Sequence, residues 1–187
     1  MALRLVMLEQ ARSSMAFGLE QYLQEYPGVF LLAIGLVSAQ AGPPRRDLRR
    51  YATEELHALD IEDTCSMDFG ERLTHSLNDH PLAGCTFFIP CTDLTPKIVG
   101  RKPECDLTIP DTSVSDQHCE LRLTKAGPML VTDMGSTNGT LVNLEHLDPG
   151  VSTEIADEQI LTVGRYSFQF FEARSLHAAM QLLEQSR

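Results

Sequence analysis

The sequence predicts a mainly β fold, with an antiparallel β-sandwich over residues 84–172, an additional α-helical region over residues 1–83 and a C-terminal helix over residues 173–187. Three observations lead to this division. The second half of the chain consists of short apolar runs separated by turn signals, which is typical of an antiparallel sandwich. The first part is rich in Leu, Ala, Gln and Glu, which favour helices. The last residues return to a helical pattern.

In the N-terminal region, apolar residues recur at the three- and four-residue spacing of a helix. They are Leu5, Leu8, Met15 and Leu19. The sequence "EYPG" at 25–28 then ends this pattern. The run Val29–Ser38 is so apolar that its periodicity does not separate a buried helix from a short strand. We expect the region to end at the turn signals of "NDHPLAG", residues 78–84.

From Cys85 onward, nine short runs have the composition of β-strands. They cover residues 85–90, 97–101, 106–109, 118–124, 129–133, 139–143, 153–156, 159–164 and 166–171. Within "HCELRLT", residues 118–124, apolar and polar residues alternate as in a half-buried strand. The pair Asn138-Gly139 is a strong signal for a tight turn. Gly164-Arg165 precedes the last run and predicts a hairpin.

The composition of the chain indicates which kinds of partner to expect and where in the cell the protein lies. The chain is 43% hydrophobic and 22% charged, with a formal net charge of −11, as expected of a globular acidic protein. Residues 84–172 contain 6 basic and 13 acidic residues, so we expect no nucleic-acid partner. The longest apolar run, Val29–Ala39, is shorter than the roughly 20 residues that span a bilayer. We expect no membrane span, no secretory signal and a cytoplasmic location.

The sequence carries no pattern of a catalytic or metal site. Its five cysteines include no CxxC pair and no zinc-like spacing with histidine, so we expect reduced thiols, no metal and no cofactor. It also contains no glycine-rich phosphate loop, no HExxH and no GxSxG. We therefore expect a protein that is not an enzyme.

Three polar clusters instead occupy loops between the expected strands. They are Gly100-Arg101, "SVSDQH" at residues 113–118, and "STNGT" at residues 136–140. Loops at one end of a sandwich lie close together although they are distant in sequence. A guanidinium, hydroxyls and an amide that meet in this way suit a phosphate group and the backbone of the peptide that carries it.

The strings "VGR", "SVSDQHCEL", "VTDMGSTNGTLVN" and "LTVGRYSFQF" occur in the order of a forkhead-associated (FHA) domain of the bacterial type, which residues 84–172 resemble. Such domains are β-sandwiches of about eleven strands that bind phosphothreonine peptides through the loops at one end. The resemblance implies a binding module without catalysis. Its partner would be a phosphothreonine-containing protein or peptide, such as a Ser/Thr protein kinase or a substrate of one.

The resemblance also implies roles for individual residues. Arg101 matches the arginine that contacts the phosphate or the peptide, and Ser115 matches the serine whose hydroxyl binds the phosphate. Thr137 lies where such domains place a residue near the phosphothreonine methyl group. Asn138 matches the asparagine that hydrogen-bonds the peptide backbone, and Ser136 belongs to the same binding loop.

Three further residues are expected to support the site. His118 matches a mainly architectural histidine that braces the binding loops. Gly139 matches the glycine that lets the turn at Asn138 form. Gly100 precedes Arg101 at the end of a strand and supports its position.

Asp116 departs from the family pattern, which has a basic or polar residue after the serine. A carboxylate a few ångströms from a phosphate dianion costs on the order of 1 kcal/mol even at high effective dielectric. Three alternatives follow. Asp116 points away and phosphate binding is only weakened, or the domain no longer binds phosphate, or Asp116 pairs with a basic residue beside the target threonine.

These observations leave two functions open. The first is a phosphothreonine-binding module for protein–protein interaction in Ser/Thr kinase signalling, which Arg101, Ser115 and Asn138 favour. The alternative is a phosphate-independent scaffold or assembly subunit with a degenerate FHA domain, which Asp116 and the acidic charge favour. The partner, the role of the N-terminal region and the oligomeric state stay open.

Overall fold

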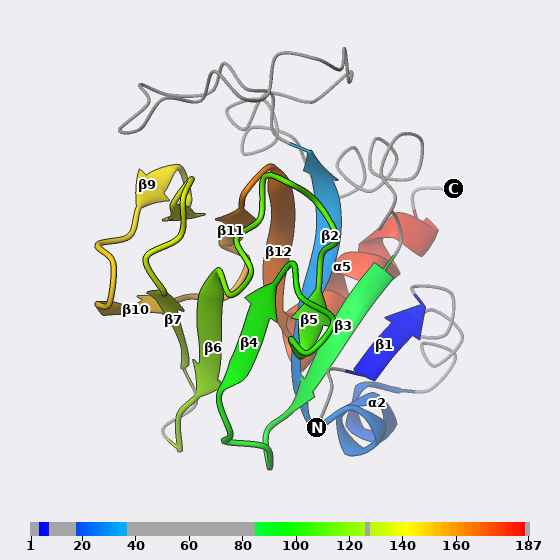
Figure 1. Cartoon of the computed structure of the whole chain (residues 1–187). Helices are drawn as coiled ribbons and strands as arrows, with labels where there is room; N and C mark the ends of the chain where they lie inside the picture. Colours follow the sequence, from blue (N-terminus) through cyan, green and yellow to red (C-terminus); the bar gives the residue numbers. More distant parts are fainter. Residues whose placement is uncertain (1–3, 8–17, 37–84, 126–127, 186–187) are drawn as a thin grey trace.

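The computed structural model describes residues 4–7, 18–36, 85–125 and 128–185, which form two β-sheets and two helices (Figure 1). The seven-stranded sheet has the order β1-β3-β2-β12-β11-β8-β9. Its strands are β1 (Arg4–Met7), β2 (Gly28–Leu36), β3 (Cys85–Pro90), β8 (Thr140–Val142), β9 (Glu145–His146), β11 (Ile160–Val163) and β12 (Tyr166–Glu172). All its neighbouring strands are antiparallel.

The five-stranded sheet has the order β10-β7-β6-β4-β5. Its strands are β4 (Lys97–Gly100), β5 (Leu107–Thr108), β6 (Cys119–Leu123), β7 (Met129–Asp133) and β10 (Ser152–Ile155). The pair β4 and β5 is parallel, and the other pairs are antiparallel. The mainly β sandwich predicted from the sequence is confirmed.

The prediction that residues 1–83 are helical is wrong for most of the residues described there. One helix, α2 (Leu19–Glu25), is present, whereas Arg4–Met7 and Gly28–Leu36 are strands. The apolar run from Val29 is a strand as far as Leu36, and it pairs with β3 on one side and β12 on the other. This strand therefore belongs to the sandwich and not to a separate helical region. Residues 37–83 of that prediction lie outside the described residues.

The continuous apolar sequence of β2 follows from burial on both of its faces. Val29, Leu31 and Ala33 join the core between the two sheets. The alternate residues Phe30, Leu32 and Ile34 join a second core on the outer face of the seven-stranded sheet. A strand that is buried on both faces is apolar throughout and lacks the alternation that identifies a half-exposed strand.

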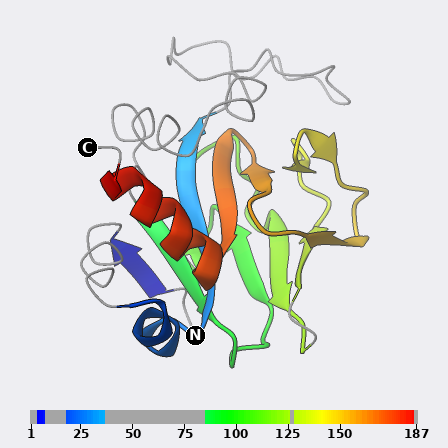
Figure 2. The same ribbon diagram turned by 180° about the vertical axis from the view of Figure 1, so that it is seen from behind.

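The second core is covered by α2 and by α5 (Ala173–Gln185), which lies across the back of the seven-stranded sheet (Figure 2). Tyr22 of α2 and Leu176 and Met180 of α5 are buried there. The C-terminal helix predicted from the spacing of apolar residues is confirmed. Among the described residues, neither helix has the length and apolar character needed to cross a membrane.

The predicted hairpin at Gly164-Arg165 is also confirmed. Val163 pairs with Tyr166 across these two residues. Gly164 has a φ of 61°, a conformation that favours glycine. A Cβ at Gly164 would lie 2.6 Å from the backbone oxygen of Ser113, so the hairpin packs directly against the loop that precedes β6.

Candidate functional site

The loop after β4 and the loop before β6 are joined through their backbones. The Arg101 N–H donates to the Ser115 carbonyl oxygen at 2.9 Å, and the Lys102 N–H donates to that of Asp116 at 3.3 Å. Gly100 lies where the two loops are closest, because a Cβ there would be 2.3 Å from the Asp116 carbonyl oxygen. Only a residue without a Cβ allows this approach, which agrees with the supporting role expected of Gly100.

His118 joins this pair of loops to the loop after β7. Its side chain is fully buried. Nδ1 accepts a hydrogen bond from the Ser115 N–H at 3.1 Å, so Nε2 carries the hydrogen and donates to the Gly139 carbonyl oxygen at 3.0 Å. Burial lowers the pKa of His118, against the opposing effects of the Gly139 carbonyl and Asp133. The imidazole is therefore neutral and links the loop before β6 to the turn before β8.

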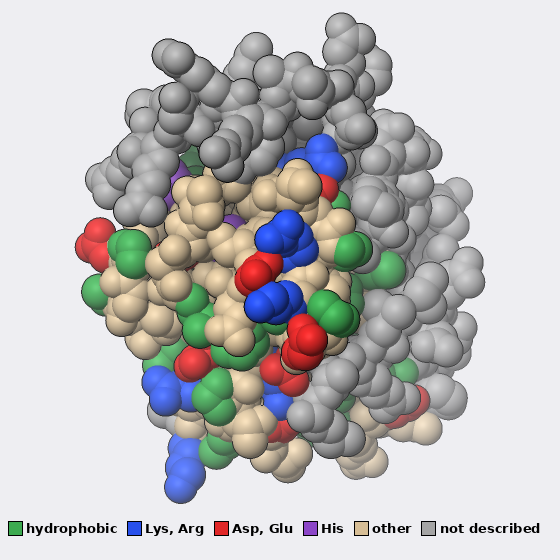
Figure 3. Space-filling view, in the orientation of Figure 1, with side chains coloured by type: hydrophobic (Ala, Val, Ile, Leu, Met, Phe, Trp, Pro, Cys, Tyr) green, Lys and Arg blue, Asp and Glu red, His purple; other side chains and the backbone are tan. Residues whose placement is uncertain are grey.

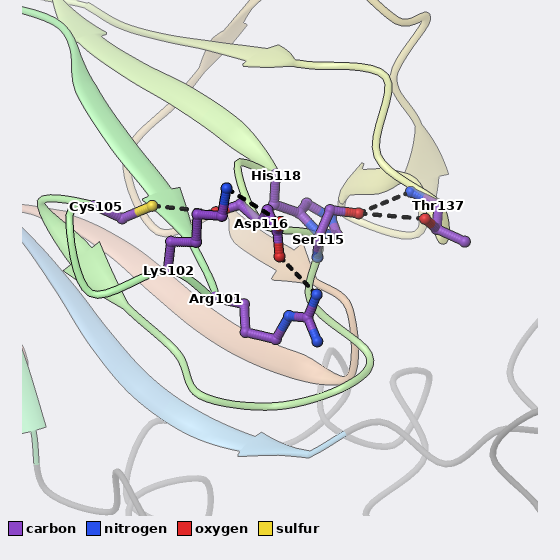
Figure 4. A network of polar contacts seen from close by, with 7 residues as sticks. All are labelled: Arg101, Lys102, Cys105, Ser115, Asp116, His118 and Thr137. Carbon is purple, nitrogen blue, oxygen red and sulfur yellow. Dashed lines mark hydrogen bonds and ion pairs between the residues drawn. The ribbon is translucent and has the colours of Figure 1, made fainter.

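Ser115 and Thr137 meet across these loops. The Thr137 N–H donates to Ser115 Oγ at 3.0 Å, and the two hydroxyl oxygens are 3.4 Å apart (Figure 4). Thr137 is exposed, and Ser115 is half-buried. The structure thus brings together two hydroxyls whose residues are 22 positions apart in the sequence, at a surface that a ligand can reach.

Asn138 lies at the tight turn between these loops and β8. Its Nδ2 donates to the Ser113 carbonyl oxygen at 2.6 Å, which holds the half-buried side chain in one orientation. Gly139 has a φ of 82°, and a Cβ there would lie 2.6 Å from Nδ1 of His146. The predicted turn at Asn138-Gly139 is present, and its positive φ favours glycine.

Ser136 has a different place from the one that the sequence suggests. It is only 5% exposed, and its hydroxyl donates to Asp133 Oδ1 at 2.5 Å. The same carboxylate accepts hydrogen bonds from the Thr140 hydroxyl at 2.7 Å and from the Gly135 N–H at 2.9 Å. The structure therefore groups Ser136 with the residues that hold the loop in shape and not with those exposed beside Ser115.

Asp133 is ionised in this arrangement although it is buried. Burial raises the pKa of its carboxyl group, but hydrogen bonds from Ser136 and Thr140 outweigh that effect, and the pKa lies below its ordinary value. Asp133 is not among the site residues predicted from the sequence. The hydroxyls that follow it at Ser136 and Thr140 are the signal that it organises the loop.

Asp116 lies between two basic side chains. Its Oδ1 is 2.6 Å from Arg101 Nη2, and its Oδ2 is 3.3 Å from Lys102 Nζ (Figure 4). The hydrogen bonds from Arg101 and then Lys102 lower the pKa of Asp116. The carboxylate therefore points toward the two basic side chains.

All three of these side chains are accessible. The exposed fractions are 46% for Arg101, 57% for Lys102 and 49% for Asp116. Basic and acidic side chains alternate on this face of the molecule (Figure 3). Lys102 is not among the residues predicted for the site, although its position next to Arg101 is a signal for it. A ligand that approaches Ser115 meets two cations that already share one carboxylate.

A second ion pair, between Arg165 and Asp111, holds the loop that precedes β6. The Arg165 guanidinium contacts the Asp111 carboxylate, which also accepts the Ser113 N–H at 2.8 Å. The Arg165 N–H donates to the Ser113 hydroxyl at 3.1 Å. Local sequence patterns do not reveal this brace, because its partners are 54 and 52 positions apart.

The order of these loops and their polar residues matches a known domain. A family model described as the FHA domain matches residues 97–164 of the chain. Residues 97–164 are an FHA domain. The resemblance inferred from the four sequence strings is therefore confirmed. The described part of the chain contains no group of three or more His, Cys, Asp or Glu residues arranged to hold a metal ion.

Bacterial proteins with this FHA domain are similar to the chain over about half of its length. The glycogen accumulation regulator GarA of Mycolicibacterium smegmatis is 36% identical over 90 residues, which cover 48% of this chain and 52% of GarA. An oxoglutarate dehydrogenase inhibitor of Corynebacterium diphtheriae is 35% identical over 92 residues, 49% of this chain and 59% of that protein. The chain thus spans about half the length of the curated relatives that it matches.

Solved FHA domains also resemble the chain. One, from a structural and functional analysis of phosphothreonine-dependent FHA domain interactions, is 28% identical and has a TM-score of 0.43. The match covers 48% of this chain and 86% of that one.

Proposed function

We propose that this FHA domain binds phosphothreonine-containing peptides and thereby mediates protein–protein interaction, without catalysis of its own. The observation that supports the proposal is that the Ser115 carbonyl oxygen accepts a hydrogen bond from the Arg101 N–H while its hydroxyl accepts one from the Thr137 N–H, next to Asn138. Arg101 and Lys102 supply positive charge, and the Ser115 hydroxyl supplies a neutral hydrogen-bonding group beside them. Charge-assisted hydrogen bonds of this kind are the strong contacts available to a phosphate.

Contacts within the fold hold the loops that carry these groups. His118, Asp133 and the ion pair of Arg165 with Asp111 hold the loops from inside the fold. A site that is ordered in advance loses less conformational entropy on binding. Within the proposal, Asn138 contacts the backbone of the bound peptide, and Thr137 lies beside the methyl group of the phosphothreonine.

A phosphothreonine partner is the product of a Ser/Thr protein kinase, so the proposal assigns the protein to kinase signalling. We expect the protein, the kinase and the partner to share the cytoplasm. GarA is named as a regulator, and the related corynebacterial protein is named as an inhibitor. Both names suit a domain that acts by binding.

Binding to a degenerate phosphothreonine peptide library and to its unphosphorylated counterpart tests the proposal. The wild-type chain should bind only the phosphorylated library, and Arg101→Ala should weaken that binding at least about tenfold, as expected for the loss of a charged hydrogen bond. Arg122→Ala is the matched control, because Arg122 is exposed on β6 and is not part of the site. Equal binding to both libraries would refute the proposal.

A phosphate-independent scaffold is the second candidate, and the contacts of Asp116 are the observation that favours it. Both basic side chains at the site already pair with this carboxylate. A native complex of that kind would survive treatment with a phosphatase, whereas a phosphothreonine-dependent complex would dissociate.

A further inference from the structure

The backbone of Asp116 has little freedom to move its side chain away from the site. Its carbonyl oxygen accepts hydrogen bonds from the Lys102 N–H and from Cys105 Sγ, both at 3.3 Å. The same oxygen is in close contact with Gly100. On the other side, the N–H of Ser115 is bound to His118. Side-chain rotation can change what the carboxylate touches, but these contacts hold the backbone of Asp116 in place.

The formal charges of Arg101, Lys102 and Asp116 do not neutralise a bound phosphate group. Arg101 and Lys102 contribute two positive charges, and Asp116 contributes one negative charge. A phosphate group near neutral pH adds a charge of about −1.5 to −2. The group of four therefore has a net charge of about −0.5 to −1, so a further cation would neutralise it.

The other basic residues of the sandwich do not supply that cation. Lys97 is buried and pairs with Asp93 at 2.7 Å, and Arg165 pairs with Asp111. Arg122 and Lys125 lie toward the far end of β6 and in the turn that follows it. Among the described residues, Arg101 and Lys102 are the basic side chains that form ion pairs with Asp116.

We infer that Asp116 forms a subsite for a cationic side chain of the target, next to the phosphothreonine. This inference rests on the proposed function. When the phosphate takes the hydrogen bonds of Arg101 and Lys102, the carboxylate loses its two partners. It is half exposed, so a Lys or Arg of the target can reach it and replace them. A target with Glu at the same position would put a third anionic group at the site.

The test uses phosphothreonine peptide pools in which one flanking position at a time is fixed as Arg, Gln or Glu. At one or more positions, the full chain should bind the Arg pool at least about fivefold more tightly than the Glu pool, as expected for close charges at a solvated surface. Asp116→Asn should bind the three pools almost equally. Asp116→Arg should reverse the preference and favour Glu.

Glu154→Gln is the matched control, because it removes one negative charge from an exposed residue on β10. It should keep the wild-type preference. The preference should also decrease with added salt, because exposed charges are screened. Thermal unfolding of each variant verifies that it is folded.

The outcomes separate this inference from the proposed function. Phosphate-dependent binding with no preference between Arg and Glu at any position would overturn the subsite and leave the proposed function standing. A preference that persists unchanged in Asp116→Asn would also overturn it. Binding that does not depend on phosphate in any pool would overturn the proposed function and this inference together.

Discussion

The Arg101 guanidinium lies 2.6 Å from the Asp116 carboxylate, although 15 positions separate the two residues in the sequence. The contact neutralises part of the positive charge that a phosphate would use. It follows from the backbone hydrogen bonds that hold the loop after β4 against the loop before β6.

Replacing Asp116 should strengthen the binding of phosphopeptides that have no charged residues beside the phosphothreonine. Asp116→Asn removes a negative charge near the phosphate, which is worth about 1 kcal/mol at high dielectric, or about fivefold in Kd. Calorimetric titration with one such peptide, against wild type and Glu154→Gln, measures the change. A weaker complex with Asp116→Asn would mean that the carboxylate contributes to phosphate binding.

The stability of the fold should fall as the pH decreases below about 6.5, the ordinary pKa of histidine. Burial lowers the pKa of His118, so the unfolded chain binds a proton there at a higher pH than the folded chain does. The stabilisation is complete above the unfolded pKa and is lost as the pH falls toward the folded pKa. Urea unfolding of wild type and His118→Gln between pH 7.5 and 5 measures it. An equal loss of stability in both proteins at low pH would mean that groups other than His118 cause the loss.

Gly100→Ala should destabilise the sandwich by about 1–3 kcal/mol, the usual cost of forcing extra volume into a packed site. The new Cβ would lie 2.3 Å from the Asp116 carbonyl oxygen, and backbone cannot move away as a flexible side chain can. Gly18→Ala is the control, because no atom lies within 4 Å of a Cβ placed there. Chemical denaturation compares the two. Similar stabilities would show that the loops separate without cost.

Ser136→Ala should mainly lower the stability of the fold, whereas Ser115→Ala should mainly lower the affinity for phosphopeptides. Ser136→Ala removes a buried hydroxyl from Asp133 and should cost about 1–3 kcal/mol of stability, since a buried carboxylate loses a partner. Ser115→Ala affects a more accessible hydroxyl and should mainly weaken phosphopeptide binding. Denaturation and peptide titration of both variants provide the comparison. A stable Ser136→Ala that fails to bind would return Ser136 to the binding residues.

Local sequence patterns were sufficient for the features that depend on neighbours in the chain. Alternation in "HCELRLT" predicts β6, the pair Asn138-Gly139 predicts the turn before β8, and helical spacing predicts α5. The polar strings also identify the loops of the FHA domain in the correct order. These features depend on side-chain period and backbone angle, which are properties of a few consecutive residues.

The tertiary structure decided the features that depend on residues far apart. The run from Val29 is a strand because β3 and β12 pair with it on both sides, which no local period indicates. Asp116 faces Arg101 and Lys102 because two loops are held together through their backbones. Each of these features depends on contacts between residues that are far apart in the sequence, and these contacts form only when the sheets pack.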